Sequence, residues 1–203
     1  KMLIESARAF AENELYPHEE EVEQSDSVSP ELAQKIRERA IEMGFYAANM
    51  PEDLGGGGLD CVSLSLVERE LGRANFALQY LVGRPSNILQ ACVGQQRDHY
   101  LFPCIRGEKT DCLAMTEPGA GSDLRSMQCR ADVDGNDYVI NGTKHFISHA
   151  DIADFVILFA ATGEEESARG PRKLISAFLD EMGTPGFSIK RWYHSVSQRC
   201  YHN

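Results

Sequence analysis

The spacing of apolar residues changes near Gly107, and this change limits the folds that the chain can adopt. Before it, apolar residues recur every three or four positions, as they do on one face of a helix. After it, they gather in short runs separated by Gly, Asn and Asp, a pattern typical of strands and turns. The sequence therefore predicts an α+β chain, with an all-α N-terminal domain over residues 1–110 and an antiparallel, barrel-like β domain over residues 111–203.

Local signals place the helices of the first domain. Ser29 can cap a helix that has Pro30 in its first turn, and Gly44 would end it. Pro17 is expected to end the first helix, and the acidic stretch 19–26 to be a solvated face or loop. The expected helices cover residues 2–15, 30–43, 64–72, 76–81, 86–92 and 95–102.

Turn signals divide the second domain. Residues 134–137 and 141–142 are expected to form hairpin turns, because Asn, Asp and Gly accept the positive φ that tight turns require. The polar stretch 164–172 is expected to be an exposed loop. The expected strands cover residues 112–116, 128–133, 138–140, 145–148, 155–161, 174–179 and 187–189.

Charge and cysteine usage exclude several classes of function. The formal net charge of -11 and the pI near 5.0 argue against binding to nucleic acid or to an anionic membrane surface. The six cysteines are scattered without a C-x-x-C pair, which favours reduced thiols over a zinc site. No run approaches the roughly 18 apolar residues of a membrane span.

Four consecutive glycines, residues 55–58, cannot form a stable helix or a central strand, because glycine loses the most backbone freedom on folding. The segment is therefore a loop. A phosphate cradle is the sharper hypothesis for it, but a P-loop would continue with Lys-Ser or Lys-Thr where Asp60 and Cys61 stand. An ordinary structural loop is the better interpretation.

The segment 113–126 concentrates small and hydroxyl-bearing residues after an apolar run. Thr116 and Ser122 offer hydroxyl groups, and Gly119 and Gly121 let backbone N–H groups approach a ligand. These residue types favour a binding segment. A Pro-Gly turn followed by a capped helix that begins at Ser122 or Asp123 stays open as the structural alternative.

This segment, residues 114–123, is followed by Asn-Gly-Thr-Lys-His-Phe-Ile-Ser at 141–148 and Gly-Thr-Pro-Gly-Phe at 183–187. Together with the Pro-Glu and glycine loop at 51–58, this order resembles the acyl-CoA dehydrogenase family over nearly the whole chain. The resemblance implies an N-terminal helical domain, a middle β domain and a C-terminal four-helix bundle, with FAD held between the last two. The bundle would follow Asn203, and we expect this chain to be part of a longer protein.

The resemblance also implies which residues meet the cofactor. Leu113, Met115 and Thr116 would lie along the isoalloxazine ring, and Phe146 would pack against its face. Ser122 would contact both the flavin site and the CoA arm of the substrate. The implied cofactor-binding residues are Leu113, Met115, Thr116, Gly121, Ser122, Phe146, Ile147 and Ser148, and no metal is implied.

The family chemistry is oxidation of an acyl-CoA thioester to the 2,3-enoyl-CoA. A glutamate removes the α proton, and the β hydrogen leaves as hydride to flavin N5. Because that glutamate belongs to the bundle, no catalytic residue is assigned here. The resemblance further implies electron-transfer flavoprotein as electron acceptor, a homo-oligomer (tetramer or dimer), and the bacterial cytoplasm, which we prefer, or the mitochondrial matrix. The alternative is a non-catalytic, truncated relative that binds CoA esters or a partner subunit.

Three polar residues near these motifs have competing interpretations. Glu117 suggests a general base, but we expect it to bond neighbouring backbone or an Arg. Lys144 suits either a phosphate or a solvated strand end. His145 and His149 stand four apart, yet on a hairpin rather than a helix, which argues against a metal pair.

Overall fold

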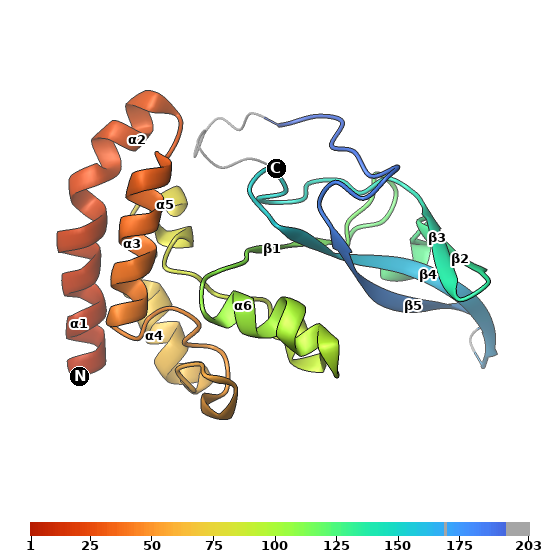
Figure 1. The fold of residues 1–203 in the computed structure, drawn as a ribbon, viewed down its shortest axis with the longest axis horizontal. Coiled ribbons are helices and arrows are strands. Elements are labelled where there is room, and N and C mark those ends of the chain that lie inside the picture. The colour runs from red at the N-terminus through yellow and green to blue at the C-terminus, as the bar shows by residue number, and fades with distance from the viewer. Residues whose placement is uncertain (169, 194–203) are drawn as a thin grey trace. The chain divides into compact units, whose positions relative to one another are not determined.

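The computed structural model describes residues 1–168 and 170–193, and these form two compact units (Figure 1). Unit 1 is Lys1–Thr110 and is helical, and unit 2 is Asp111–Tyr193 and contains the sheet. The expected order of a helical region followed by a β region is confirmed. Cys200 and the C-terminal part of the expected β domain, residues 194–203, lie outside the described residues.

Unit 1 is built from helices of unequal length. Short 3-10 turns cover Glu52–Leu54 and Asn87–Ala91, and a π turn, Arg97–Leu101, leads into the last helix. The α-helices are α1 (Met2–Phe10), α2 (Glu19–Ser25), α3 (Pro30–Glu42), α4 (Cys61–Leu71), α5 (Phe76–Tyr80) and α6 (Phe102–Ile105).

The cap of α3 is confirmed, because the Leu32 N–H donates to Ser29 Oγ at 3.2 Å. The expectation that Pro17 ends the first helix is wrong, whereas the acidic stretch, expected as a solvated face or a loop, is the mostly solvated helix α2. A π turn, Ala11–Leu15, and a 3-10 turn, Tyr16–His18, carry the chain from α1 into α2. Pro17 lies in the first turn of the 3-10 segment, where the N–H that it lacks would have no helical partner.

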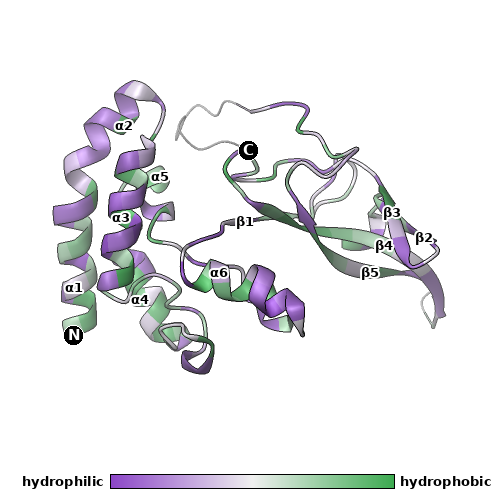
Figure 2. Cartoon of the chain, viewed as in Figure 1, coloured by the Kyte–Doolittle hydropathy of each residue, from purple (hydrophilic) through white to green (hydrophobic). Residues whose placement is uncertain are grey.

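The core of unit 1 lies between α1, α3, α4 and α5. Phe10, Ile36, Val67 and Leu78 are almost fully buried there, and α2 adds Val22. Figure 2 shows hydrophilic and hydrophobic residues alternating along α1 and α3, as expected for helices with one buried face. Burial of one apolar face therefore explains why the acidic stretch 19–26 is helical and not a loop.

A buried carboxylate also joins α1 to α4. Glu70 is 2% exposed, and its oxygens lie 2.9 Å from Arg8 Nε, 2.7 Å from Arg69 Nη2 and 3.4 Å from Arg73 Nη1. Hydrogen bonds from Arg8 and Arg69 lower the pKa of Glu70 to about 2. Glu70 therefore stays ionised, and it serves the packing of unit 1.

Unit 2 contains a five-stranded sheet in the order β1-β4-β2-β3, with β5 paired to β4. β1 and β2 run parallel to β4, whereas β5 is antiparallel to β4 and β3 to β2. Figure 1 shows β4 and β5 as the two longest strands. The strands are β1 (Asp111–Ala114), β2 (Arg130–Asp134), β3 (Asp137–Asn141), β4 (Phe155–Ser167) and β5 (Gly170–Glu181).

The sheet is mixed and open over the described residues, so the antiparallel, barrel-like description was too loose. Parallel pairing of β1 with β4 requires a long connection between them, and residues 115–154 supply it. The core of this unit includes Met127, Cys129, Val156 and Ala160.

One of the two hairpins expected in unit 2 is present, and several other local expectations fail. The hairpin at 134–137 is confirmed, with Gly135 at φ 64°. Residues 164–167 and 170–172 are not a loop, because Glu164 pairs with Lys173 and Glu165 with Arg172 in the β4–β5 ladder. No hairpin forms at 141–142, where Gly142 packs against Cys129. Residues 145–148 and 187–189 are not strands.

Candidate functional site

In the glycine loop of unit 1, the chain's own backbone occupies the space beside the glycines. The N–H groups of Gly56, Gly57 and Gly58 donate to backbone oxygens of Pro51 (2.9 Å), Ala47 (3.1 Å) and Met50 (2.8 Å). A Cβ on Gly56 would lie 2.3 Å from the Met50 oxygen. These glycines permit backbone to pack on backbone, so the phosphate-cradle hypothesis is wrong for this loop.

The segment 113–126 has a different environment. After β1, the Glu117 N–H donates to the Ala120 oxygen at 2.8 Å and the Ala120 N–H returns a bond of 3.2 Å to the Glu117 oxygen, which closes a tight turn. A Cβ on Gly119 or Gly121 would meet nothing within 4 Å. The segment is a turn, as the structural alternative held, but one whose glycines face open space.

A short helix also begins after this turn, as the same alternative held. The 3-10 helix Leu124–Ser126 is capped by Asp123, whose carboxylate accepts the Arg125 N–H at 3.1 Å and the Ser126 hydroxyl at 2.6 Å. Asp123 is therefore occupied with local structure. Ser122, immediately before it, is exposed.

The two motifs lie side by side although nearly thirty positions separate them in the sequence. The His145 N–H donates to the Thr116 oxygen at 2.8 Å, and Lys144 Nζ donates to the Met115 oxygen at 3.1 Å. Lys144 Nζ also lies 2.8 Å from Glu117 Oε1. Backbone and side-chain bonds therefore assemble one site from residues 115–117 and 144–146.

Glu117 anchors this assembly. Its side chain is 3% exposed and accepts the N–H groups of Gln128 (2.6 Å) and Cys129 (2.9 Å) in addition to the Lys144 ammonium. Burial alone would raise the pKa of Glu117, but Lys144 and the two N–H groups hold it below its usual range. With both oxygens occupied, Glu117 is no general base, which confirms the backbone interpretation. Its charged partner is Lys144 and not an Arg.

The predicted site residues differ in exposure. Leu113 on β1 is 41% exposed and Phe146 is 57% exposed, so two apolar side chains face outward beside the assembled motifs. The Thr116 N–H and hydroxyl make no hydrogen bond to any described residue. Met115, Ile147 and Ser148 are partly buried, with Ile147 packed on the sheet core, and Gly121 and Ser122 are exposed.

The backbone of Phe146 departs from the expected strand. Phe146 has φ 56° and His149 has φ 61°, so the segment 145–149 turns twice through left-handed conformations. Such turns cannot be seen in the alternation of apolar residues. No cluster of metal-ligating side chains occurs in residues 1–168 and 170–193.

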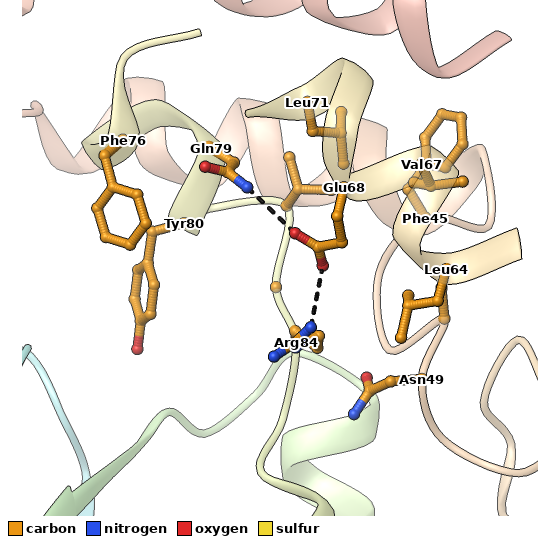
Figure 3. Close-up of a pocket in the computed structure, with 13 residues that line it drawn as sticks. Phe45, Asn49, Leu64, Val67, Glu68, Leu71, Phe76, Gln79, Tyr80 and Arg84 are labelled. Carbon is orange, nitrogen blue, oxygen red and sulfur yellow. Dashed lines mark hydrogen bonds and ion pairs between the residues drawn. The ribbon is translucent and has the colours of Figure 1, made fainter. Parts of the chain in front are cut away.

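Unit 1 contains a cavity of about 260 Å³ that the sequence did not predict (Figure 3). Phe45, Leu64 and Phe76 give it an apolar lining. On its polar side Glu68 accepts from Gln79 at 3.1 Å and pairs with Arg84 at 3.6 Å. The cavity can take a small apolar group with a polar end. Its residues come from three separate segments, so no single motif marks it.

Cysteine and hydropathy expectations agree with the structure. The five described cysteines are free, and burial raises the pKa of the Cys112 thiol to about 12. None of the helices in the described part of the chain is long and apolar enough to cross a membrane.

Family models match both units. The model for "Acyl-CoA dehydrogenase, N-terminal domain" matches residues 1–108, and that for "Acyl-CoA dehydrogenase, middle domain" matches residues 112–202. The chain belongs to the acyl-CoA dehydrogenase family.

Individual relatives of this family member support the same assignment. The chain is 36% identical to the mitochondrial long-chain specific acyl-CoA dehydrogenase of Sus scrofa, over 97% of the chain and 45% of that protein. It is 33% identical to the caffeyl-CoA reductase-Etf complex subunit CarC of Acetobacterium woodii, over 97% of the chain and 51% of that protein. The chain spans about half the length of the curated relatives it matches.

The fold also matches a cofactor-bound relative. A glutaryl-CoA dehydrogenase from Mycobacterium smegmatis, solved in complex with FADH2, has a TM-score of 0.80 and 26% identity, over 98% of this chain and 50% of that one. The helical region and the mixed sheet are therefore those of the acyl-CoA dehydrogenase fold.

Proposed function

We propose that the protein containing this chain is an FAD-dependent oxidoreductase that interconverts an acyl-CoA thioester and its 2,3-enoyl-CoA. The observation that carries the proposal is the joining of residues 115–117 to 144–146 beside two exposed apolar side chains. Family membership and the FADH2-bound relative support it. Residues 1–110 and 111–203 would be its helical and β domains.

The residues present fit a flavin. A planar, mostly apolar ring with one polar edge needs a flat apolar surface and hydrogen-bond donors beside it. Leu113 and Phe146 offer the first, and the Thr116 N–H and hydroxyl, which bond no described residue, offer the second. Ile147, packed on the sheet core, would contribute backbone only.

When bound, FAD would supply a two-electron acceptor for the β hydrogen of the acyl group, and a base would take the α proton. The residues of this chain bind and orient. Thr116 would direct its donors at the polar edge of the ring, where negative charge develops on reduction. Met115 would line the same edge, and Gly121, Ser122 and Ser148 would hold the cofactor and the thioester in register.

The direction of the reaction and the partners belong to the same proposal. One relative is named a dehydrogenase and another a reductase in a complex with Etf, so electron-transfer flavoprotein suits either direction. We propose a homo-oligomer, in the bacterial cytoplasm or the mitochondrial matrix. The second candidate, a non-catalytic module that binds CoA esters, needs no flavin.

The visible spectrum of the purified intact protein tests the proposal. We expect flavin absorption that is bleached by an acyl-CoA under anaerobic conditions and restored by an acceptor. A straight-chain acyl-CoA and an aryl-substituted one would be compared as substrates. A colourless protein that FAD does not reconstitute, yet that still binds CoA esters, would establish the non-catalytic module instead.

A further inference from the structure

Phe146 has a backbone conformation that needs support from its surroundings. Its φ of 56° lies in the left-handed region, which a bulky side chain rarely adopts. The side chain is also 57% exposed, so burial does not hold it in place. Strained residues persist where neighbouring contacts over-determine them, and such places are often functional.

Two further aromatic residues supply these contacts. The His145 ring stacks on the Phe146 ring at 3.8 Å between centroids and 21° between planes. The Tyr193 ring lies 5.1 Å from Phe146 and 5.2 Å from His145. A hydrogen bond of 2.6 Å joins His145 Nε2 to the Tyr193 hydroxyl, across 48 positions of sequence.

The same histidine is tied to the first motif. The backbone N–H of His145 donates to the backbone oxygen of Thr116 at 2.8 Å, so His145 connects Thr116, Phe146 and Tyr193. The Arg191 guanidinium lies 5.2 Å from the Tyr193 ring centroid and covers that ring. In this cluster the hydrogen bond from Tyr193 orients the His145 imidazole, and the stacked imidazole in turn orients the Phe146 ring.

We propose that His145 and Tyr193 are positioning residues, which hold the Phe146 ring as a preset wall for the flavin. This inference rests on the proposed function. A wall that is already ordered loses no rotamer freedom when the ligand binds, so it raises affinity without adding a contact. The hydrogen bond then acts on the cofactor through Phe146, and neither His145 nor Tyr193 needs to touch it.

The competing explanation is that the three rings only stabilise unit 2. The two explanations differ in what the Tyr193 hydroxyl does. A purely structural hydroxyl would change only the stability of the protein, whereas a positioning hydroxyl would also change the affinity for flavin and the environment of bound flavin.

Tyr193→Phe in the intact protein removes that hydroxyl and keeps the ring. We expect the Kd for FAD to rise about three- to tenfold, because one ordinary hydrogen bond is lost. We also expect an altered visible circular dichroism of the bound flavin, which a hydroxyl that only stabilises the fold would leave unchanged. Tyr138→Phe is the matched control, because Tyr138 lies in the same unit with its ring against Phe178 at 5.2 Å.

A double-mutant cycle identifies the bond itself. His145→Phe keeps a stacking ring but cannot bond Tyr193, so the double variant should be no worse than either single one. Additive losses would overturn the proposal, as would unchanged Kd and dichroism in Tyr193→Phe. If the wild-type protein binds no flavin, the proposed function fails and this inference fails with it, whereas flavin binding with unaffected variants overturns the inference alone.

Discussion

The two glycine-rich segments of this protein look alike in sequence and differ in structure. In unit 1, the N–H groups of Gly56–Gly58 are bonded to the preceding backbone, and a Cβ on Gly56 would strike Met50. In unit 2, Gly119 and Gly121 have open space where a Cβ would lie. The glycines of unit 1 admit the protein's own backbone, and those of unit 2 leave room for a ligand.

The difference shows what a glycine pattern means physically. In unit 1 the chain's own backbone approaches the glycines closely, whereas in unit 2 no described atom does. Only the positions of the surrounding atoms tell the two cases apart. Substitutions at the two segments should therefore have opposite consequences for stability and for binding.

The largest effect is expected for Gly56→Ala. The new Cβ would lie 2.3 Å from the Met50 oxygen and 2.4 Å from the Met50 Cβ, so backbone must move. We expect the free energy of unfolding to fall by roughly 3–5 kcal/mol, the range of severe core substitutions. Urea denaturation followed by circular dichroism measures it, and a loss below about 1 kcal/mol would contradict the close packing of this loop.

Glu117→Gln tests the anchor of the second segment. Removing the charge leaves Lys144, 8% exposed, without its carboxylate, at a cost of about 3 kcal/mol at neutral pH. Because the folded pKa of Glu117 is depressed, its contribution is present above the ordinary glutamate pKa and is lost as pH falls through the lower folded value. The variant should lack that part of the acid dependence.

Denaturation at neutral and acidic pH measures both effects of Glu117→Gln. Asp132→Asn is the control, since Asp132 pairs with Arg130 at 3.0 Å on the surface and should change stability by no more than about 0.5 kcal/mol. Equal losses in the two variants would mean that burial of Glu117 adds nothing.

The smallest effect on stability is expected for Gly121→Ala. Its Cβ would meet no atom within 4 Å, and Gly121 is not among the glycines with positive φ, so stability should change by less than about 0.5 kcal/mol. Affinity for FAD should nevertheless fall about tenfold, because the methyl group occupies space next to the proposed cofactor. Calorimetric titration of the FAD-free protein measures it. Unchanged affinity would remove Gly121 from the site.

Predictions made from the sequence succeeded where short-range chemistry decides the structure. The Ser29 cap of α3 and the hairpin at 134–137 depend on a few adjacent residues and are confirmed. Pro17 and the stretch 164–172 were misinterpreted because distant partners outweigh local preference. Burial of Val22 keeps the acidic stretch helical, and the β4–β5 ladder extends through its polar end.

In the candidate site, too, some features follow from the sequence and others only from the tertiary structure. The sequence by itself determined the family, the helical and β regions, and the residues of the two motifs, because these follow from residue types in a fixed order. Only the tertiary structure decided that His145 bonds Thr116 and Tyr193. It also decided that the Glu117 carboxylate accepts hydrogen bonds from Lys144 and two backbone N–H groups, and that the sheet is mixed. Those contacts join residues up to 48 positions apart, and the path of the chain between them, not any local preference, brings them together.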